Sequence, residues 1–423
     1  MKLFFNLSQL VVDENGSGKR GKDQNKIEVI KDSAMLIDGE IIKDYGNSKE
    51  MLTKYPDAEK IDLSGKIILP GFIDPHTHPV FGGTREQEFA MRLQGVPYAE
   101  IARKGGGIYT TVKQTRAASK EDLLKSTLKV LDSMLSFGVT TIEAKSGYGL
   151  DKDTEIKMLE VLREANSIHP IDIISTYLGA HTIPLEYKGK PKKYIEFMLK
   201  EVMPEIKERN LARYTDIWCE DLAFSCKDTE YFLKRAREQG FDIRLHANEL
   251  SSFGGGLVAS ELKADSADHM VFTSDNEIRE MEESGVVATL LPGTMFTMKS
   301  EIYAPARNFI DFGVYVALGS DMNPGSCMSE NIQMVMTMAA IEMDMTPEEV
   351  INSVTINAAH SLRLTETIGS ITRGKKADFI VMDNPNYYFI FYHWGSNAVS
   401  QVYKNGRLVY NKKNEGVRYD SKC

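Results

Sequence analysis

The sequence predicts an α/β protein with a (β/α)8 TIM-like barrel and a small β-sandwich domain formed from both termini. In the middle of the chain, short apolar segments alternate with longer amphipathic stretches, which is the pattern of repeated βα units around a parallel sheet. Eight apolar segments occur there, the number of strands in such a barrel. The two ends instead carry short apolar runs separated by turn signals, which indicates a β-rich unit.

Eight strands over about 300 residues fit a barrel with inserted loops. A doubly wound parallel sheet is the alternative. The strand count favours the barrel, and none of the eight segments is followed by the Gly-x-Gly-x-x-Gly turn typical of dinucleotide-binding sheets. The segments are Ile67–Ile73, Val139–Ala144, Asp172–Tyr177, Asp216–Cys219, Phe241–Leu245, Ala267–Val271, Val286–Leu291 and Val314–Leu318.

Turn signals define the strands at the two ends. Met35–Ile42 contains Asp-Gly between apolar pairs and Val402–Tyr410 contains Asn-Gly, so each is expected to form a hairpin. Ala377–Met382 is a further predicted strand. Because the termini of a domain often lie close together, we expect residues 1–69 and 370–423 to form one small β domain.

Residues 70–369 are expected to form the barrel domain. Within the small domain, the segment Asp13–Lys26 is rich in Gly, Lys and Asp. Such a polar composition is typical of a solvated loop, and we expect this segment to be mobile.

Composition narrows the function classes. The 423 residues include 51 basic and 60 acidic side chains, a formal charge of −9, and 42% hydrophobic residues. This balance gives no electrostatic footprint for nucleic acid or for an acidic membrane, so a small-molecule substrate is favoured. No apolar run approaches the roughly 20 residues that cross a bilayer, and the apolar N-terminus is too short for a signal peptide, which predicts a cytoplasmic protein.

The most informative motif is Pro70–His78, in which an apolar run ends in two histidines one residue apart. Side chains i and i+2 of a strand point to the same face, so His76 and His78 can reach one metal ion together. For such a motif taken alone, two solvated loop histidines are the alternative.

Polar residues at the ends of other predicted strands favour the metal. The active site of a barrel forms at the carboxyl ends of its strands. Any one histidine there would more often be a hydrogen-bonded structural residue, but several beside a carboxylate indicate a metal site. Five of the eight histidines fall at or just beyond strand ends, and two carboxylates accompany them: His76, His78, His181, His246, His269, Glu249 and Asp321.

Four of these side chains are the predicted ligands, since they follow strands one, five and eight and leave a position open for water. They are His76, His78, His246 and Asp321. One Zn or Fe ion per chain would lower the pKa of that water and polarise a carbonyl group. The sequence leaves open which of Asp321, Glu249 and His269 transfers the proton. For Glu249 a surface carboxylate is the alternative, and for His269 a core histidine.

Longer blocks of sequence resemble a known family. Pro70–His78 is similar to the amidohydrolase superfamily. Five further blocks resemble the imidazolonepropionase family within it, and together the similarity covers nearly the whole chain. These blocks are Phe81–Phe89, Lys145–Leu150, Leu178–His181, Leu245–Glu249 and Gly319–Ser326.

The resemblance implies hydrolysis of the cyclic amide of 4-imidazolone-5-propanoate to N-formimidoyl-L-glutamate in histidine degradation, with metal-bound water attacking the ring carbonyl. It implies the same four metal ligands and a homodimer. An arginine suits this substrate, because Arg85 can donate two hydrogen bonds to a propionate. Around the substrate the resemblance places Arg85, Tyr148, His181, Glu249, Asn323, Gly325 and Ser326.

Other functions remain open. A heterocycle deaminase would use the same kind of site. A binuclear hydrolase often has a carboxylated lysine at the end of strand four, which Asp216–Asp221 lacks, although Glu220 could bridge a second ion. A non-catalytic binding protein would be expected to lose its ligands, and all four are present.

Overall fold

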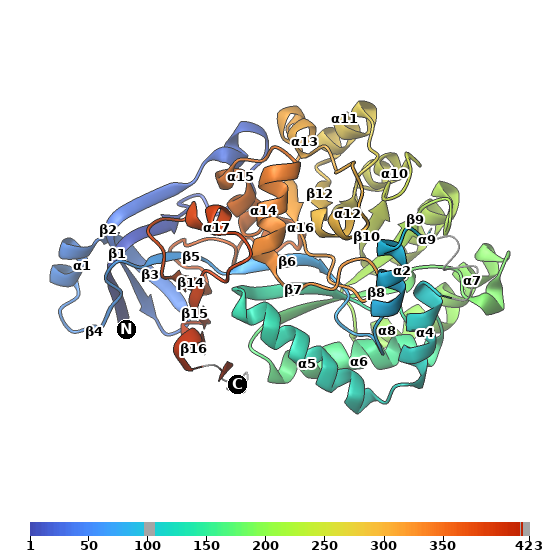
Figure 1. The fold of residues 1–423 in the computed structure, drawn as a ribbon, viewed down its shortest axis with the longest axis horizontal. Coiled ribbons are helices and arrows are strands. Elements are labelled where there is room, and N and C mark those ends of the chain that lie inside the picture. The colour runs from blue at the N-terminus through green and yellow to red at the C-terminus, as the bar shows by residue number, and fades with distance from the viewer. Residues whose placement is uncertain (97–105, 415, 418–423) are drawn as a thin grey trace.

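The computed structural model describes residues 1–96, 106–414 and 416–417. Two β-sheets organise this part of the chain, an eight-stranded parallel sheet that forms the barrel and a nine-stranded mixed sheet (Figure 1). The predicted barrel with a β domain from both termini is confirmed. Among the helices described, none is both long enough and apolar enough to cross a membrane.

The barrel strands lie around the sheet in chain order, and each neighbouring pair is parallel. The sheet closes at its carboxyl end, where Thr77 bridges Met322. There the backbone N–H of Asp321 also donates to the carbonyl of His76, at 3.1 Å. The strands are β6 (Phe72–Thr77), β7 (Val139–Lys145), β8 (Asp172–Ala180), β9 (Tyr214–Cys219), β10 (Asp242–Ala247), β11 (Ser266–His269), β12 (Val287–Leu290) and β13 (Val316–Leu318).

Helices follow the strands and lie outside them (Figure 1). Side-chain caps fix where several helices begin, because Ser119, Asp151, Ser225 and Ser274 each accept a backbone N–H of the first turn. The main helices are α2 (Glu86–Leu93), α4 (Ile108–Ala117), α5 (Lys120–Ser136), α6 (Lys152–Ile168), α7 (Pro191–Phe197), α8 (Met203–Glu208), α9 (Cys226–Glu238), α10 (Gly255–Leu262), α11 (Asp275–Ser284), α12 (Pro292–Thr297), α13 (Ala306–Phe312), α14 (Ile332–Glu342), α15 (Pro347–Ser353) and α16 (Ile356–Ser361).

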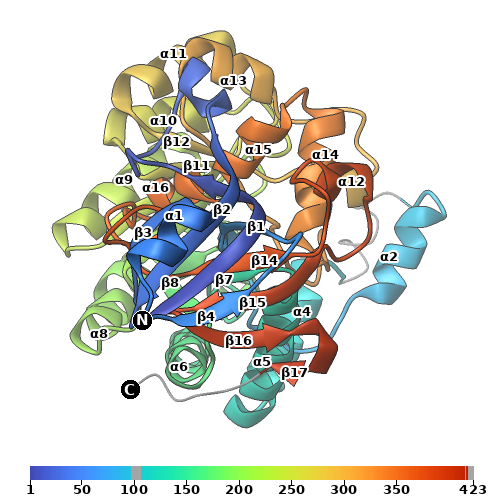
Figure 2. The same cartoon turned by 90° about the vertical axis from the view of Figure 1, so that its left-hand side faces the viewer.

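The second sheet, called the terminal sheet below, combines both ends of the chain. Figure 2 shows its blue N-terminal strands beside its red C-terminal strands. Both predicted hairpins are present, with Gly39 and Gly406 in their turns. The strands are β1 (Lys2–Val12), β2 (Glu28–Asp38), β3 (Ile41–Asn47), β4 (Glu59–Asp62), β5 (Ile67–Pro70), β14 (Phe379–Met382), β15 (Val399–Lys404), β16 (Arg407–Asn411) and β17 (Gly416–Val417), with α1 (Ser48–Lys54) and α17 (Phe389–Tyr392) beside them.

The prediction of one barrel strand over Ile67–Ile73 is wrong in part. The first half of this run is β5, which pairs with β1 and β14 of the terminal sheet, and only the second half enters the barrel as β6. The partner changes at Gly71, whose N–H bonds to Asp378, while the N–H of Phe72 bonds to Gly138. A β-carbon at Gly71 would lie 2.5 Å from the Thr140 side chain, so only glycine fits this crossing.

The prediction that Asp13–Lys26 is a mobile loop of the small domain is also wrong. The segment contains the 3-10 helix η1 (Gly21–Asn25) and packs on the barrel, against α13 and α15. Gln24 is fully buried, and its amide group donates to and accepts from the backbone of Val316 in β13. Gln24 thus anchors the segment to the barrel, although most of the other polar side chains of the segment are exposed.

Candidate metal centre and active site

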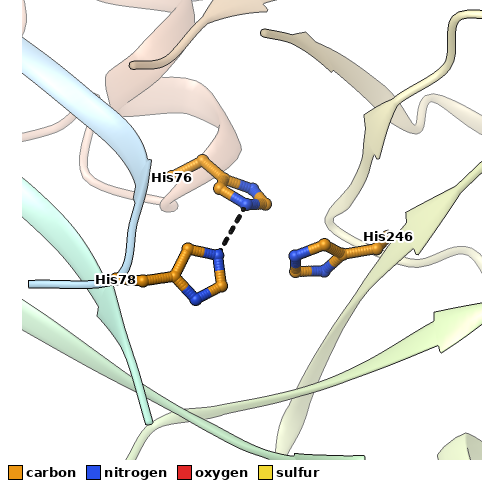
Figure 3. Close-up of side chains that lie close together, drawn as sticks. All are labelled: His76, His78 and His246. Atoms are coloured by element: carbon orange, nitrogen blue, oxygen red, sulfur yellow. Dashed lines mark hydrogen bonds between the residues drawn. The ribbon is translucent and has the colours of Figure 1, made fainter. Parts of the chain in front are cut away.

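Three histidines from two strands meet at the carboxyl end of the barrel (Figure 3). His76 lies within β6, His78 follows it, and His246 lies in β10 on the other side of the barrel. The Nε2 atoms of His76 and His78 are 3.3 Å apart. Asp321 approaches the same point, with its Oδ1 3.5 Å from Nε2 of His76 and 3.4 Å from Nε2 of His78. All four predicted ligands therefore converge.

The unpaired atoms of this cluster fit a metal ion. One potential ligand atom from each of His76, His78 and His246 lies within 4.8 Å of the others, and the same holds for His76, His269 and Asp321. The Nε2 atom of His246 is buried without a hydrogen-bond partner, a costly state that a cation would relieve. Imidazole and carboxylate donors suit zinc and iron. The cluster can hold a metal.

Buried carboxylates orient two of the histidines. Asp268 Oδ2 lies 2.7 Å from Nδ1 of His76, and Asp216 Oδ1 lies 3.0 Å from Nδ1 of His246. A hydrogen bond at Nδ1 leaves the Nε2 lone pair directed at the shared position. Burial and the charge of Lys145 act to lower the pKa of His76, but the hydrogen bond and charge of Asp268 outweigh them and raise it to about 9. The buried carboxylates therefore favour a positive charge at this end of the barrel, either a proton on His76 or a bound metal ion.

The backbone around the cluster adopts unusual conformations. Asp321, His269 and Asn248 have positive φ angles of 51°, 75° and 50°. Side chains other than glycine rarely adopt this left-handed region, and such outliers gather at functional sites. The hydroxyl of Thr294 donates to Oδ2 of Asp321 and leaves Oδ1 for the cluster. These left-handed backbone conformations set the directions of the Asp321 and His269 side chains.

Two further titratable groups lie beside the cluster, Glu249 and His269. Burial, followed by the charge of Asp321, raises the pKa of Glu249 to about 7. Burial lowers the pKa of His269 to about 3, so its imidazole is neutral at pH 7. Both nitrogens of His269 are buried without a hydrogen-bond partner, and Nε2 is 3.9 Å from Glu249 Oε2. Burial thus shifts the pKa values of the two groups in opposite directions, that of Glu249 upward and that of His269 downward.

A cavity of about 360 Å³ opens above the cluster. Eleven of the twelve site residues expected from the sequence line it, and the twelfth, His76, lies fully buried beneath. The eleven are His78, Arg85, Tyr148, His181, His246, Glu249, His269, Asp321, Asn323, Gly325 and Ser326.

Arg85 lies at the rim of this cavity, at the residue before α2. Its side chain is 9% exposed, and its Nε is buried without a hydrogen-bond partner. Glu88 lies 3.8 Å away. A β-carbon on Gly325 would lie 1.4 Å from Nη2 of Arg85, so the guanidinium needs a glycine beside it. A buried cation with a free donor is a suitable anion site.

The remaining residues form the walls. The rings of His181 and His78 stack, with centroids 5.0 Å apart, and Nδ1 of His181 bonds to the carbonyl of Gly147 at 3.1 Å. Asn323 shapes its own loop: its amide oxygen accepts the N–H groups of Gly325 and Ser326 at 2.8 Å. Its Nδ2 donates to the carbonyl of Asp321 at 2.6 Å. Asn323 thus fixes the loop that faces Arg85.

Similarity to known proteins decides the family. The model of the amidohydrolase family matches residues 67–409. Imidazolonepropionase from Bacillus thuringiensis (strain Al Hakam) is 47% identical over 411 residues, which cover 97% of each chain. Imidazolonepropionase from Bacillus cereus (strain B4264) is 46% identical over the same lengths. The chain belongs to the amidohydrolase family, and within it to the imidazolonepropionases.

Two solved structures share the fold of this chain at low sequence identity. An adenosine deaminase from Xanthomonas campestris with bound zinc aligns with a TM-score of 0.73 and 17% identity, over 97% of this chain and 93% of the other. E. coli guanine deaminase aligns with a TM-score of 0.67 and 17% identity, over 97% and 100% of the chains. At such identity the likeness establishes the barrel and its β domain alone.

Five residues that line the cavity were not expected from the sequence: Arg92, Ile108, Trp218, Leu250 and Met298. Two of them carry a usable signal, since Arg92 lies two helical turns after Arg85 and Leu250 directly follows Glu249. Glu220, considered above as a bridge to a second ion, accepts hydrogen bonds from the N–H of Leu250 and from Ser251. Within the described residues it joins neither group of potential ligands.

Proposed function

We propose that the chain hydrolyses the cyclic amide of 4-imidazolone-5-propanoate, opening the ring to give N-formimidoyl-L-glutamate. The observation that carries the proposal is that one cavity joins a set of metal-ligand donors to a buried arginine with a free donor. A ring amide with a propionate side chain needs both. The 47% identity to named imidazolonepropionases over 97% of the chain supports the same substrate.

His76, His78, His246 and Asp321 would hold one Zn or Fe ion. When bound, such an ion acts as a Lewis acid toward a carbonyl oxygen and increases the acidity of water. Asp321 suits the role of a ligand because its pKa lies well below the ordinary value, where hydrogen bonds from His76 and His78 outweigh burial. It therefore stays ionised.

Glu249 would move the proton. A carboxylate whose pKa lies near 7 can accept a proton from the attacking water and return it to the ring nitrogen that leaves. His269 stays neutral, and its N–H can donate to the oxygen that becomes negative as the ring carbonyl is attacked. The two groups thereby take different tasks within 3.9 Å of each other.

Arg85 would bind the propionate carboxylate. Its Nε has no hydrogen-bond partner, so a carboxylate gains a charge-assisted bond without displacing one. Tyr148 and His181 would flank the ring, and the loop Asn323–Ser326 would close the cavity next to Arg85. This arrangement sets the distance between the carboxylate and the amide to be cleaved.

Purified, metal-loaded protein tests the reaction. Ring opening leaves the cleaved nitrogen attached to the product, so the absorbance of imidazolone propionate should disappear without release of ammonia. A deaminase releases one ammonia per turnover. Protein that left imidazolone propionate intact and released ammonia from guanine or cytosine would contradict the proposal. Elemental analysis should give one transition metal per chain, and two equivalents both needed for turnover would exclude a mononuclear site.

We further propose a cytoplasmic homodimer. Exposed apolar side chains on or near α14 and α17 support self-association, because Ile341, Tyr392 and Trp394 are 66%, 81% and 65% exposed. Light scattering would give twice the chain mass, and a monomer at all concentrations would contradict the proposal.

A further inference from the structure

Five charged side chains lie beneath the histidine cluster, and all are fully buried: Glu143, Lys145, Asp216, Arg244 and Asp268. They come from four strands of the barrel: the neighbouring strands β9, β10 and β11, and β7, which β8 separates from them. Burial of unpaired charge is costly, so each must find a partner inside the barrel.

Lys145 is the common partner of the three carboxylates. Its Nζ lies 2.9 Å from Glu143 Oε1, 2.9 Å from Asp216 Oδ2 and 3.7 Å from Asp268 Oδ2. Arg244 also pairs with Asp268, since its Nη2 donates to Asp268 Oδ2 at 3.4 Å, while its other hydrogen bonds go to the backbone carbonyls of Pro75 and Ser361. Lys145 alone links Asp216 to Asp268 among the contacts described.

These two aspartates are the ones that orient ligands. Asp268 holds His76 and Asp216 holds His246, through Nδ1 in both cases. A continuous series of contacts therefore runs from His76 through Asp268, Lys145 and Asp216 to His246, with Lys145 in the middle. The three carboxylates and two cations leave one net negative charge below the cluster, which favours a cation above it.

We propose that Lys145 is a positioning residue for the metal centre. It holds Asp216 and Asp268 in place, and through them it keeps His76 and His246 with Nε2 facing the shared position. Without its charge, Asp216 would keep no lysine or arginine partner among the contacts described and Asp268 would keep Arg244 alone. Both carboxylates would then be held less firmly beneath their histidines, and the loss would be greatest at His246. The inference rests on the ligand set of the proposed function.

The chain offers a matched control. Lys404 is also buried, and it too lies between two carboxylates, 2.5 Å from Asp378 and 2.8 Å from Asp172. It belongs to β15 of the terminal sheet, and Asp172 is the first residue of β8, at the end of the barrel opposite the cluster. Loss of either lysine removes the same kind of ion pair, but only one supports the ligands.

The experiment compares Lys145→Met with Lys404→Met. Metal affinity is measured by competition with a chelator, and ligand geometry is followed in the visible spectrum of the Co²⁺-loaded protein. Outer partners of metal ligands typically change affinity by about 10–100-fold, so Lys145→Met should bind metal at least about tenfold more weakly, with an altered spectrum. Lys404→Met should melt at a lower temperature with unchanged affinity and spectrum.

Wild-type affinity and spectrum in Lys145→Met would overturn the inference, as would an equal loss in Lys404→Met. If Lys145→Met does not fold, Lys145→Gln replaces it, since glutamine keeps a donor while removing the charge, and the same loss of affinity is expected. The proposed function fails separately: wild-type protein would then bind metal, and Lys145→Met would bind it weakly, but neither would open the imidazolone ring.

Discussion

The mouth of the barrel and the terminal sheet differ in the side chains that gather in them, which are mostly polar at the mouth and apolar in the sheet. At the mouth, polar atoms of Arg85, His246 and His269 are buried without hydrogen-bond partners, and the backbone is left-handed at His269 and Asp321. Such features cost stability and persist where a ligand repays them. The mouth is organised for binding.

The terminal sheet is organised for packing. Phe379 stacks on Tyr403 with ring centroids 4.5 Å apart, and Phe4 meets both rings edge-on at 5.2 and 5.1 Å. Aromatic clusters of this kind add to the free energy of folding without offering a ligand site. We therefore expect substitutions at the mouth to reduce activity more than stability. Substitutions in the terminal sheet should reduce stability more than activity.

The largest effect is expected for His246→Ala, which removes a ligand from the centre of the mouth. The protein should lose its metal and its activity and yet remain folded, because β10 packs through Ile243 and Leu245, both fully buried. Elemental analysis, turnover and circular dichroism measure the three properties. His360→Ala, a histidine outside the cluster, should keep the metal. Full metal content and turnover in His246→Ala would remove this residue from the ligand set.

The next effect is expected for Glu249→Gln, which keeps the shape of the side chain but removes the carboxylate that we propose moves the proton. General acid–base catalysis contributes about 10²–10⁴-fold, and kcat should fall by a factor in this range with metal retained. A fall of less than about tenfold would assign the proton to another group.

The same variant separates function from stability. The pKa of Glu249 is raised from its ordinary value of 4.5 to about 7, so the native state binds its proton more tightly than the unfolded chain. Its contribution to stability is present below pH 4.5 and is lost as the pH rises through 7. Above pH 7 the metal-free Glu249→Gln protein should therefore be more stable than wild type, by on the order of 2 kcal/mol. Equal stability of the wild-type and Glu249→Gln proteins at pH 8 would contradict the raised pKa of Glu249.

A smaller effect is expected for Arg85→Ala. Loss of a charge-assisted contact that leaves the partner charge buried costs about 2–5 kcal/mol, so kcat/KM for the propionate substrate should fall at least tenfold. Metal content should not change, because a guanidinium has no lone pair to offer a metal ion. An analogue without the carboxylate should be hydrolysed equally well by both proteins. An equal loss for the two substrates would contradict carboxylate binding.

The sequence predicted the mouth well because its residues follow strand ends. The carboxyl ends of parallel strands meet at one edge, so polar residues after apolar runs identify the site without knowledge of strand order. Six of the eleven expected residues that line the cavity were predicted in this way, and the family resemblance supplied the other five: Arg85, Tyr148, Asn323, Gly325 and Ser326. Arg92 and Trp218 were missed because a helix face and a barrel register decide whether such side chains reach the cavity.

The buried charges beneath the histidine cluster, the change of sheet at Gly71 and the contact of Gln24 with the barrel could not be predicted in the same way. Glu143 and Lys145 lie in a fully buried strand, and Lys145 finds its other carboxylate partners on strands whose register the sequence does not reveal. Gly71 separates two strands that belong to different sheets, although the apolar run is continuous. Gln24 finds its partner 292 residues away, in Val316, so composition alone described its segment as solvated.

The smallest effect on activity is expected for Phe379→Ala in the terminal sheet. Truncation of a buried phenylalanine costs about 3–5 kcal/mol, so the free energy of unfolding should fall by this amount. Turnover and metal content at 25 °C should not change. The prediction is demanding, because Phe379 pairs with Pro70, only six residues before His76, and β5 runs directly into β6. A loss of metal in folded Phe379→Ala would show that the sheet also positions the ligands, and the division between the two regions would then fail at their junction.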